Sequence, residues 1–266
     1  MSLDFGPDRG AQPYPPPPPR PYAPPARREP FGAGQVLSDT ISVYVANLVP
    51  FTVLTGIVLS PAIGATVLFA AMAQGSEDTA VALGEGIGGL LRIVLQPLAT
   101  GAVTYGVVQQ VRGHHPPLGD CISVGLSRLL SVFAVGLLSG LIIVLGLFAF
   151  CIPGLIFMAM YYVAVPAAVI EQPGVMASLR RSSDLTDGYR WSIFGLAIIV
   201  GLLGGAAGAF AEMLGVAAGP LIGAILSAVA ECVATAFGAT AAAVAYYRLR
   251  LTKEGVDADQ LAQIFE

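Results

Sequence analysis

Long apolar runs with almost no charged residues alternate with short polar segments along most of this chain. The runs lie at residues 51–72, 93–111, 129–150, 155–170, 192–211 and 221–247. A helix of about 20 residues crosses the ~30 Å hydrocarbon core of a bilayer, and each run is close to that length. The pattern predicts an all-α, polytopic membrane protein with six transmembrane helices.

Shorter amphipathic segments precede the first, third and fifth runs. In residues 35–48 the apolar positions recur at helical spacing, opposite Gln35, Ser38, Asp39 and Ser42. These apolar positions are Leu37, Ile41, Tyr44, Val45 and Leu48. Residues 118–128 repeat the arrangement, and a third amphipathic segment lies within residues 171–191. We therefore expect a short interfacial helix before spans one, three and five.

The third of these segments is the most polar stretch in the second half of the chain. Pro173 and Gly174 should end the preceding span, a helix should start at Val175, and Gly188 should stop it. The expected charged face holds Arg180, Asp184 and Asp187, and the expected apolar face holds Val175, Met176 and Leu179. Arg180, Arg181, Asp184, Arg190 and Trp191 are the candidate residues for a cytoplasmic interface with lipid or protein.

The connections between the runs are predicted from their polar and turn-forming residues. Residues 74–80 should form an acidic loop, and the glycine-rich residues 85–91 should lead into span two and leave Arg92 at the membrane edge. Residues 151–154 should turn spans three and four into an antiparallel hairpin. Residues 212–220 are expected to form a loop between spans five and six.

Composition supports the membrane class and narrows the chemistry. The chain is 55% hydrophobic and only 11% charged, its mean hydropathy is +0.76, and its net charge is −4, so we expect no nucleic-acid partner. The three cysteines match neither a zinc site nor a disulfide framework. His114 and His115 precede two prolines, which favours a solvated loop over a metal site. We expect no metal and no cofactor.

The chain divides into three parts. Residues 1–34 are rich in proline and poor in aliphatic side chains, so they should form a disordered tail, either a solubilising linker or a docking strip for a protein that binds proline-rich segments. Residues 35–250 should form the transmembrane domain, and residues 251–266 a C-terminal tail. Nearly all of the thirteen basic residues flank the same ends of the spans, with Arg92 the exception. The positive-inside rule then places both termini in the cytoplasm.

Three stretches carry motifs that point to one family. They are SDTISVYVANLVPF at 38–51, AVPAAVIEQPGVMASLRRSSDLTDGYRWSIFGL at 164–196 and VAYYRLRLTKEGVDADQLAQIF at 244–265. Together they resemble the membrane domain of glycerophosphoryl diester phosphodiesterases. The positions that match that pattern are Glu171, Ala177, Leu179, Arg181, Ser182, Thr186, Gly188, Arg190, Trp191, Tyr246, Tyr247, Arg250, Lys253, Glu254, Gly255 and Asp257. The resemblance implies a bacterial inner-membrane protein.

The resemblance does not imply the phosphodiesterase activity. In that family the chemistry belongs to a separate soluble barrel domain, which this sequence does not contain. We therefore expect a non-catalytic integral membrane protein, an anchor or scaffold that contacts the lipid bilayer. The alternative is a transporter or channel for a small solute or ion, which would use polar residues within the spans. Glu231, Gln96 and Arg92 are the candidate intramembrane polar site, because a charged Glu231 needs a partner near mid-membrane.

Small residues predict where the spans approach one another most closely. Close backbone approach is the main source of helix association in lipid. Three pairs of glycines lie one turn apart on spans three and five: Gly136 with Gly140, Gly201 with Gly205, and Gly204 with Gly208. We expect these pairs to form helix contacts.

Overall fold

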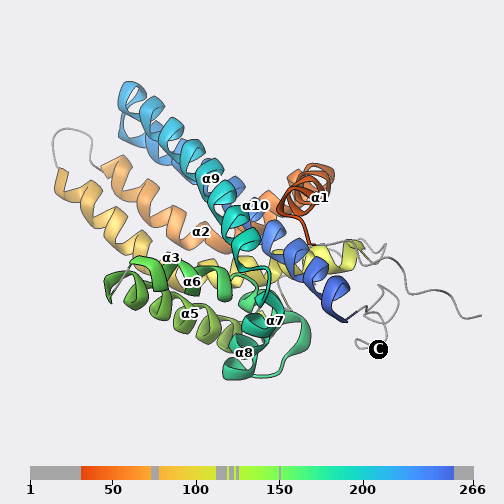
Figure 1. Cartoon of the computed structure of the whole chain (residues 1–266). Helices are drawn as coiled ribbons and strands as arrows, with labels where there is room; N and C mark the ends of the chain where they lie inside the picture. Colours follow the sequence, from red (N-terminus) through yellow and green to blue (C-terminus); the bar gives the residue numbers. More distant parts are fainter. Residues whose placement is uncertain are drawn as a thin grey trace, which may run out of the picture.

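The computed structural model describes residues 31–72, 78–111, 126–149 and 151–254, together with Gly119 and Ser123. These residues are almost entirely helical (Figure 1). The helices are α1 (Ala33–Ala46), α2 (Leu48–Met72), α3 (Asp78–Val111), α5 (Leu129–Ala149), α6 (Cys151–Met160), α7 (Ala164–Glu171), α8 (Val175–Thr186), α9 (Arg190–Ala218) and α10 (Pro220–Glu254). No strand occurs in this part of the chain.

Six segments of the described chain are long and apolar enough to cross a membrane, which confirms the predicted fold class. They comprise α2, most of α3, α5, the combined α6 and α7, α9, and α10. Figure 1 shows α2 and α3 as one antiparallel pair and α9 and α10 as another, with α5 and α6 beside each other. The protein is therefore a multi-pass membrane protein.

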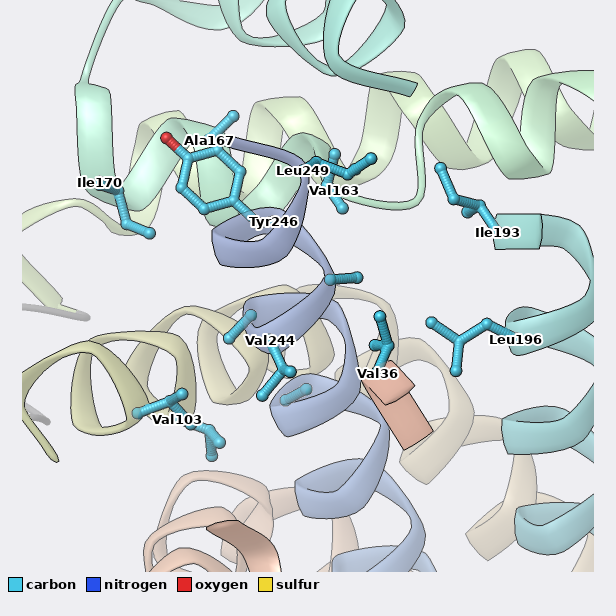
Figure 2. Packing of buried hydrophobic residues seen from close by; sticks show 14 of the residues in the cluster. Val36, Val103, Val163, Ala167, Ile170, Ile193, Leu196, Val244, Tyr246 and Leu249 are labelled. Atoms are coloured by element: carbon cyan, nitrogen blue, oxygen red, sulfur yellow. The ribbon is translucent and has the colours of Figure 1, made fainter. Parts of the chain in front are cut away.

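Helix α10 occupies the centre of the packing. It contacts α9, α2, α3 and α1 along its length. In Figure 2, Val244, Tyr246 and Leu249 of α10 lie among side chains from the surrounding helices, including Val36, Val103, Ala167 and Leu196. The last helix of the chain thus connects elements that are far apart in sequence.

Helix α3 is continuous through the glycine-rich residues 85–91, so the predicted lead-in is wrong. The glycines there allow α2 to approach. A Cβ added to Gly84 would lie 2.6 Å from Cβ of Phe69, and one added to Gly88 would lie 2.6 Å from Cγ2 of Thr66. Glycine disfavours a helix in water, but in a membrane it allows close packing. The prediction treated these glycines as helix-breaking, as they are in water, and was wrong for that reason.

The connection between α9 and α10 is also shorter than predicted. Helix α9 runs to Ala218, and Gly219, with a φ of 97°, makes the turn, so residues 212–218 are helix rather than loop. A Cβ on Gly215 would lie 2.5 Å from Cα of Gly223. The two helices are therefore in contact up to their connection.

The hairpin of spans three and four is confirmed, but its turn is tighter than expected. Cys151 already belongs to α6, so residues 151–154 form the first turn of that helix. A Cβ on Gly154 would lie 2.5 Å from the backbone nitrogen of Leu147 on α5. Only a glycine fits this approach, so α5 and α6 are in close contact at this end of the hairpin.

Span four is broken between α6 and α7 at residues 161–163. Pro166 lies in the first turn of α7, and a proline ring clashes with the carbonyl four residues earlier, which favours a break at that point. The carbonyl of Met160 accepts hydrogen bonds from Ser182 Oγ at 2.7 Å and from Thr186 Oγ1 at 3.4 Å instead. Helix α8 therefore supplies hydrogen bonds to the polar group that the break exposes.

The first predicted amphipathic helix is present as α1, with a different buried face. Val36, Thr40 and Tyr44 are buried, whereas Ile41 and Val45 are exposed. The apolar residues used for the prediction therefore point largely away from the bundle. Exposed aliphatic side chains are normal on a surface that faces lipid, so burial does not follow hydrophobicity here.

Most of the predicted glycine pairs are not contacts. A Cβ on Gly140, Gly201, Gly205 or Gly208 would meet nothing within 4 Å. One member of two pairs does approach a neighbour: Gly204 lies against Ala234, and Gly136 lies against Pro97. Spacing identifies glycines on one face but does not show which face meets another helix.

Some predictions fall outside the described residues. These are the proline-rich residues 1–30, His114 and His115, most of the amphipathic segment 118–128, and residues 255–266. Helix α10 continues to Glu254, beyond the predicted end of the membrane domain at residue 250.

Candidate functional site

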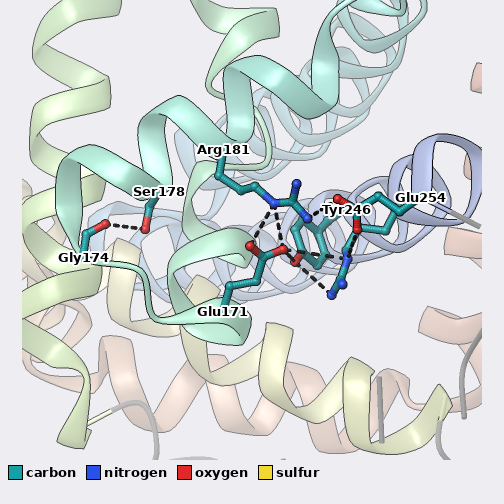
Figure 3. Close-up of polar contacts among 7 residues, drawn as sticks. Glu171, Gly174, Ser178, Arg181, Tyr246 and Glu254 are labelled. Atoms are coloured by element: carbon teal, nitrogen blue, oxygen red, sulfur yellow. Dashed lines mark hydrogen bonds and ion pairs between the residues drawn. The ribbon is translucent and has the colours of Figure 1, made fainter. Parts of the chain in front are cut away.

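Five charged or hydroxyl side chains gather where α7, α8 and α10 meet (Figure 3). We call Glu171, Arg181, Tyr246, Arg250 and Glu254 the ionic cluster. Arg181 Nε donates to both carboxylate oxygens of Glu171, at 2.9 and 2.8 Å, and the hydroxyl of Tyr246 donates to Glu171 Oε1 at 2.5 Å. Arg181 also forms an ion pair with Glu254. The cluster therefore joins three helices.

Arg250 completes the charge balance of the ionic cluster. Its Nε donates to Glu254 Oε2 at 2.9 Å and lies 3.7 Å from Glu171 Oε1. Its side chain is only 7% exposed. Burial alone would lower the pKa of Arg181, but the hydrogen bonds and charges of Glu171 and Glu254 raise it overall. Two arginines thus neutralise two glutamates in a partly desolvated site.

The short segment between α7 and α8 brings Arg181 to Glu171. Gln172 adopts a left-handed conformation with a φ of 51°, and Gly174 has a φ of 91°. The hydroxyl of Ser178 then donates to the carbonyl of Gly174 at 2.8 Å, in the first turn of α8 (Figure 3). Positive φ is rare outside glycine, and here it reverses the chain so that α8 packs against α7.

Helix α8 begins at Val175 and ends before Gly188 as predicted, and its buried face includes Leu179 of the predicted apolar face, with Val175 packed against the same cluster. Ser178, Leu179, Ser182, Leu185 and Thr186 are buried, whereas Met176 is 72% exposed. The serine and threonine hydroxyls satisfy their own turns or the carbonyl of Met160. Small polar residues therefore pack against the bundle beside Leu179, and Met176 of the predicted apolar face does not.

Of the predicted interface residues, only Arg181 belongs to the ionic cluster. Arg180 and Asp184 are exposed, and Arg190 lies 3.4 Å from Asp187. Trp191 is 84% exposed and stacks edge-on against Phe194. Arg180, Asp184 and Trp191 therefore lie on the outer surface of the segment, Arg190 is half-buried, and Arg181 points inward.

The predicted intramembrane residues lie together between α3 and α10. Arg92 Nε donates to both carboxylate oxygens of Glu231, at 2.7 and 2.9 Å. One turn along both helices, Gln96 Nε2 donates to Thr235 Oγ1 at 3.0 Å. Both contacts join residues 139 positions apart. Helices α3 and α10 are thus parallel and in register.

The Arg92–Glu231 pair lies near the middle of the bundle rather than at its edge. Pro97, just over one turn from Arg92, lies against Gly136, close to the middle residue of α5, Ser139. Cys232 lies 3.7 Å from the Cβ position of Gly56, close to the middle of α2. Helix α3 begins more than three turns before Arg92, so Arg92 lies well inside this helix rather than at its start, and its depth in the bilayer stays a prediction.

A family described as a domain of unknown function (DUF7847) matches residues 98–249. The chain belongs to the DUF7847 family. The DUF7847 match contains Glu171, Arg181, Tyr246 and Glu231, and it begins after Arg92 and ends before Arg250. No curated protein and no solved structure matches the chain.

Other surfaces of this DUF7847 protein offer little polar chemistry. The described residues contain no group of three or more histidine, cysteine or acidic side chains that could hold a metal ion. An open groove of about 330 Å³ between α2 and α10 is lined by Thr52, Val53, Ile63, Val67, Ile225, Ala228, Val229 and Cys232. Seven of these side chains are apolar or weakly polar, so the groove suits hydrocarbon.

Proposed function

We propose that this DUF7847 protein is a non-catalytic membrane anchor or scaffold. The observation that supports the proposal most directly is the ionic cluster, in which each glutamate faces two arginines. Such a network fixes α8 relative to the end of α10, because moving either helix would expose unpaired charge. A fixed polar surface is what a scaffold presents to a partner.

The resemblance to the membrane domain of glycerophosphoryl diester phosphodiesterases is consistent with this role. The residues of the ionic cluster are among the positions that carry the resemblance, so the same motif positions that match in sequence meet in space. We infer that α8 and both termini face the cytoplasm of a bacterial inner membrane, and that the proline-rich tail is available to a protein partner.

A crosslinking experiment in the native membrane tests the scaffold. Wild-type, Arg181→Ala and Glu231→Gln proteins would be crosslinked, purified and compared by mass spectrometry. We expect proteins that crosslink to the wild type to be lost with Arg181→Ala and retained with Glu231→Gln. If no crosslinked protein depends on Arg181, and solute uptake by reconstituted vesicles requires Glu231, the scaffold proposal is wrong and transport is favoured.

Cysteine labelling tests the orientation separately. In a background without native cysteines, an impermeant reagent added to intact cells should leave Ser183→Cys on α8 unlabelled. It should label Val216→Cys, which is 90% exposed near the opposite end of α9. Labelling of Ser183→Cys would reverse the proposed topology.

A further inference from the structure

Arg92 lies between two carboxylates rather than one. Its Nε bonds Glu231 on α10, while its Nη1 lies 3.8 Å from Glu85 Oε2, two turns earlier on α3. The side chain of Glu85 is 64% exposed, against 23% for Glu231. The same guanidinium therefore has a partner on the neighbouring helix and a second, more exposed carboxylate on its own helix.

Gly88 leaves room for the guanidinium of Arg92 beside Thr66 of α2. It lies between Glu85 and Arg92 on the same face of α3, and a Cβ added to it would be 3.2 Å from Arg92 Nη1. The guanidinium thus extends across a position that has no side chain. Because Arg92 Nη1 is already 3.8 Å from Glu85 Oε2, Arg92 has a second carboxylate within ion-pair distance.

We propose that Glu231 is a proton-binding site within the membrane, and that it becomes available when Arg92 moves from Glu231 to Glu85. This inference goes beyond the scaffold role and does not depend on it. Once Arg92 has moved, an ionised Glu231 near mid-membrane lacks a counter-ion, which costs several kcal/mol. The carboxylate then takes one proton from water and becomes a neutral carboxylic acid. Arg92 stays charged and is paired with ionised Glu85.

Few other charges near Glu231 compete with this exchange. Helix α3 contributes Arg92 and Glu85, and Cys232 is adjacent on α10. Helices α2 and α5 have no titratable side chain. Helix α9 carries Arg190 and Glu212 toward its two ends, and Asp39 of α1 bonds Arg248 at 2.7 Å. Tyr44 of α1 is buried and its hydroxyl donates to the carbonyl of Val233 at 3.4 Å, so among the described residues Arg92 is the charged group in contact with Glu231.

Infrared spectroscopy of the full-length protein in lipid vesicles tests the proposal. The signal is the C=O stretching band of a protonated carboxylic acid, recorded as the pH is lowered. The spectrum of Glu231→Gln is subtracted from that of the wild type. We expect this difference to contain one acid band. In Glu85→Gln the band should appear at a pH lower by about one unit, a tenfold higher proton concentration, because Arg92 then has no other carboxylate. Arg92→Gln should show the band already at neutral pH.

The matched control is Glu212→Gln, which removes an exposed carboxylate from α9 and should leave the band unchanged. The proposal is overturned if the acid band persists in Glu231→Gln, or if the band of Glu85→Gln appears at the wild-type pH. Glu85 is exposed, so its substitution does not put folding at risk. A shift of the acid band by the same amount in Glu212→Gln would also overturn the proposal, because removing any carboxylate would then have the same effect.

Discussion

The ionic cluster and the Arg92–Glu231 pair use the same contact in different surroundings. In both, an arginine Nε donates to the two oxygens of a glutamate. In the cluster, Glu171 also accepts from Tyr246 and lies near Arg250. Within the described residues, Glu231 forms an ion pair with Arg92 alone. Each glutamate of the ionic cluster therefore keeps an arginine after the loss of one, whereas Glu231 loses its counter-ion when Arg92 is removed.

The largest loss of stability should therefore come from breaking the Arg92–Glu231 pair. Arg92→Ala leaves Glu231 without its counter-ion, and we expect a loss of about 3 kcal/mol in the free energy of unfolding, measured by denaturant titration in mixed micelles. Arg92→Ala combined with Glu231→Ala should cost less than the sum of the two single changes, because no charge is then left alone. Additive losses would show that the two side chains are not coupled.

A smaller loss is expected from the cluster. Arg181→Ala should cost about 2 kcal/mol by the same measurement, since Arg250 remains close to both glutamates. Its neighbour Arg180 is exposed and provides the control, with an expected change below about 0.5 kcal/mol for Arg180→Ala. A loss for Arg181→Ala larger than that for Arg92→Ala would contradict the distinction between network and pair.

Packing beside the pair can be tested with two adjacent glycines. Gly88→Ala places a Cβ against Thr66 and Arg92, and we expect a loss of about 1–2 kcal/mol from overpacking. Gly89 has nothing within 4 Å of its Cβ position. Gly89→Ala should therefore be neutral or stabilise the helix by up to about 1 kcal/mol. Equal effects of the two changes would show that α2 and α3 do not pack as described.

The smallest loss of stability should come from removing one hydroxyl of the ionic cluster. Tyr246→Phe removes the hydrogen bond to Glu171 and keeps the buried ring, so the expected loss is about 1 kcal/mol. Glu171 still has Arg181 as its partner. Thermal unfolding in detergent would measure the change, and a loss as large as that of Arg181→Ala would mean that the hydroxyl organises the cluster.

The spans were predictable from the sequence because a bilayer requires long uncharged runs. The helix at α8 was predictable as well, since Gly174 and Gly188 bracket it. The break in span four and the turns between the helices were harder to predict. Residues 212–220 contain a glutamate, two glycines and a proline, which suggest a loop in water, yet Gly215 forms a close helix contact with Gly223. Sequence alone does not show which glycines meet a neighbour.

The ionic cluster and the Arg92–Glu231 pair differ in how well the sequence predicted their contacts. Arg92 and Gln96 were named beside Glu231 because a carboxylate within a span requires a donor, and the structure pairs Arg92 with it. The members of the ionic cluster were each named as motif positions, but nothing in the sequence placed Glu171 beside Glu254. Their meeting depends on the reversal at Gln172 and on the extension of α10 to Glu254, and both are features of the tertiary structure.

The register of α3 and α10 has a consequence for how the protein is made. Arg92 and Glu231 are 139 residues apart, and ribosomes add about 5–20 residues per second. Arg92 therefore enters the bilayer roughly 10–30 s before its carboxylate is synthesised. During that interval the nascent chain holds a cation without its final partner, and a chain that stops before α10 keeps it permanently. The Arg92–Glu231 contact therefore forms only after the last helix has been made, and it cannot guide the insertion of the earlier spans.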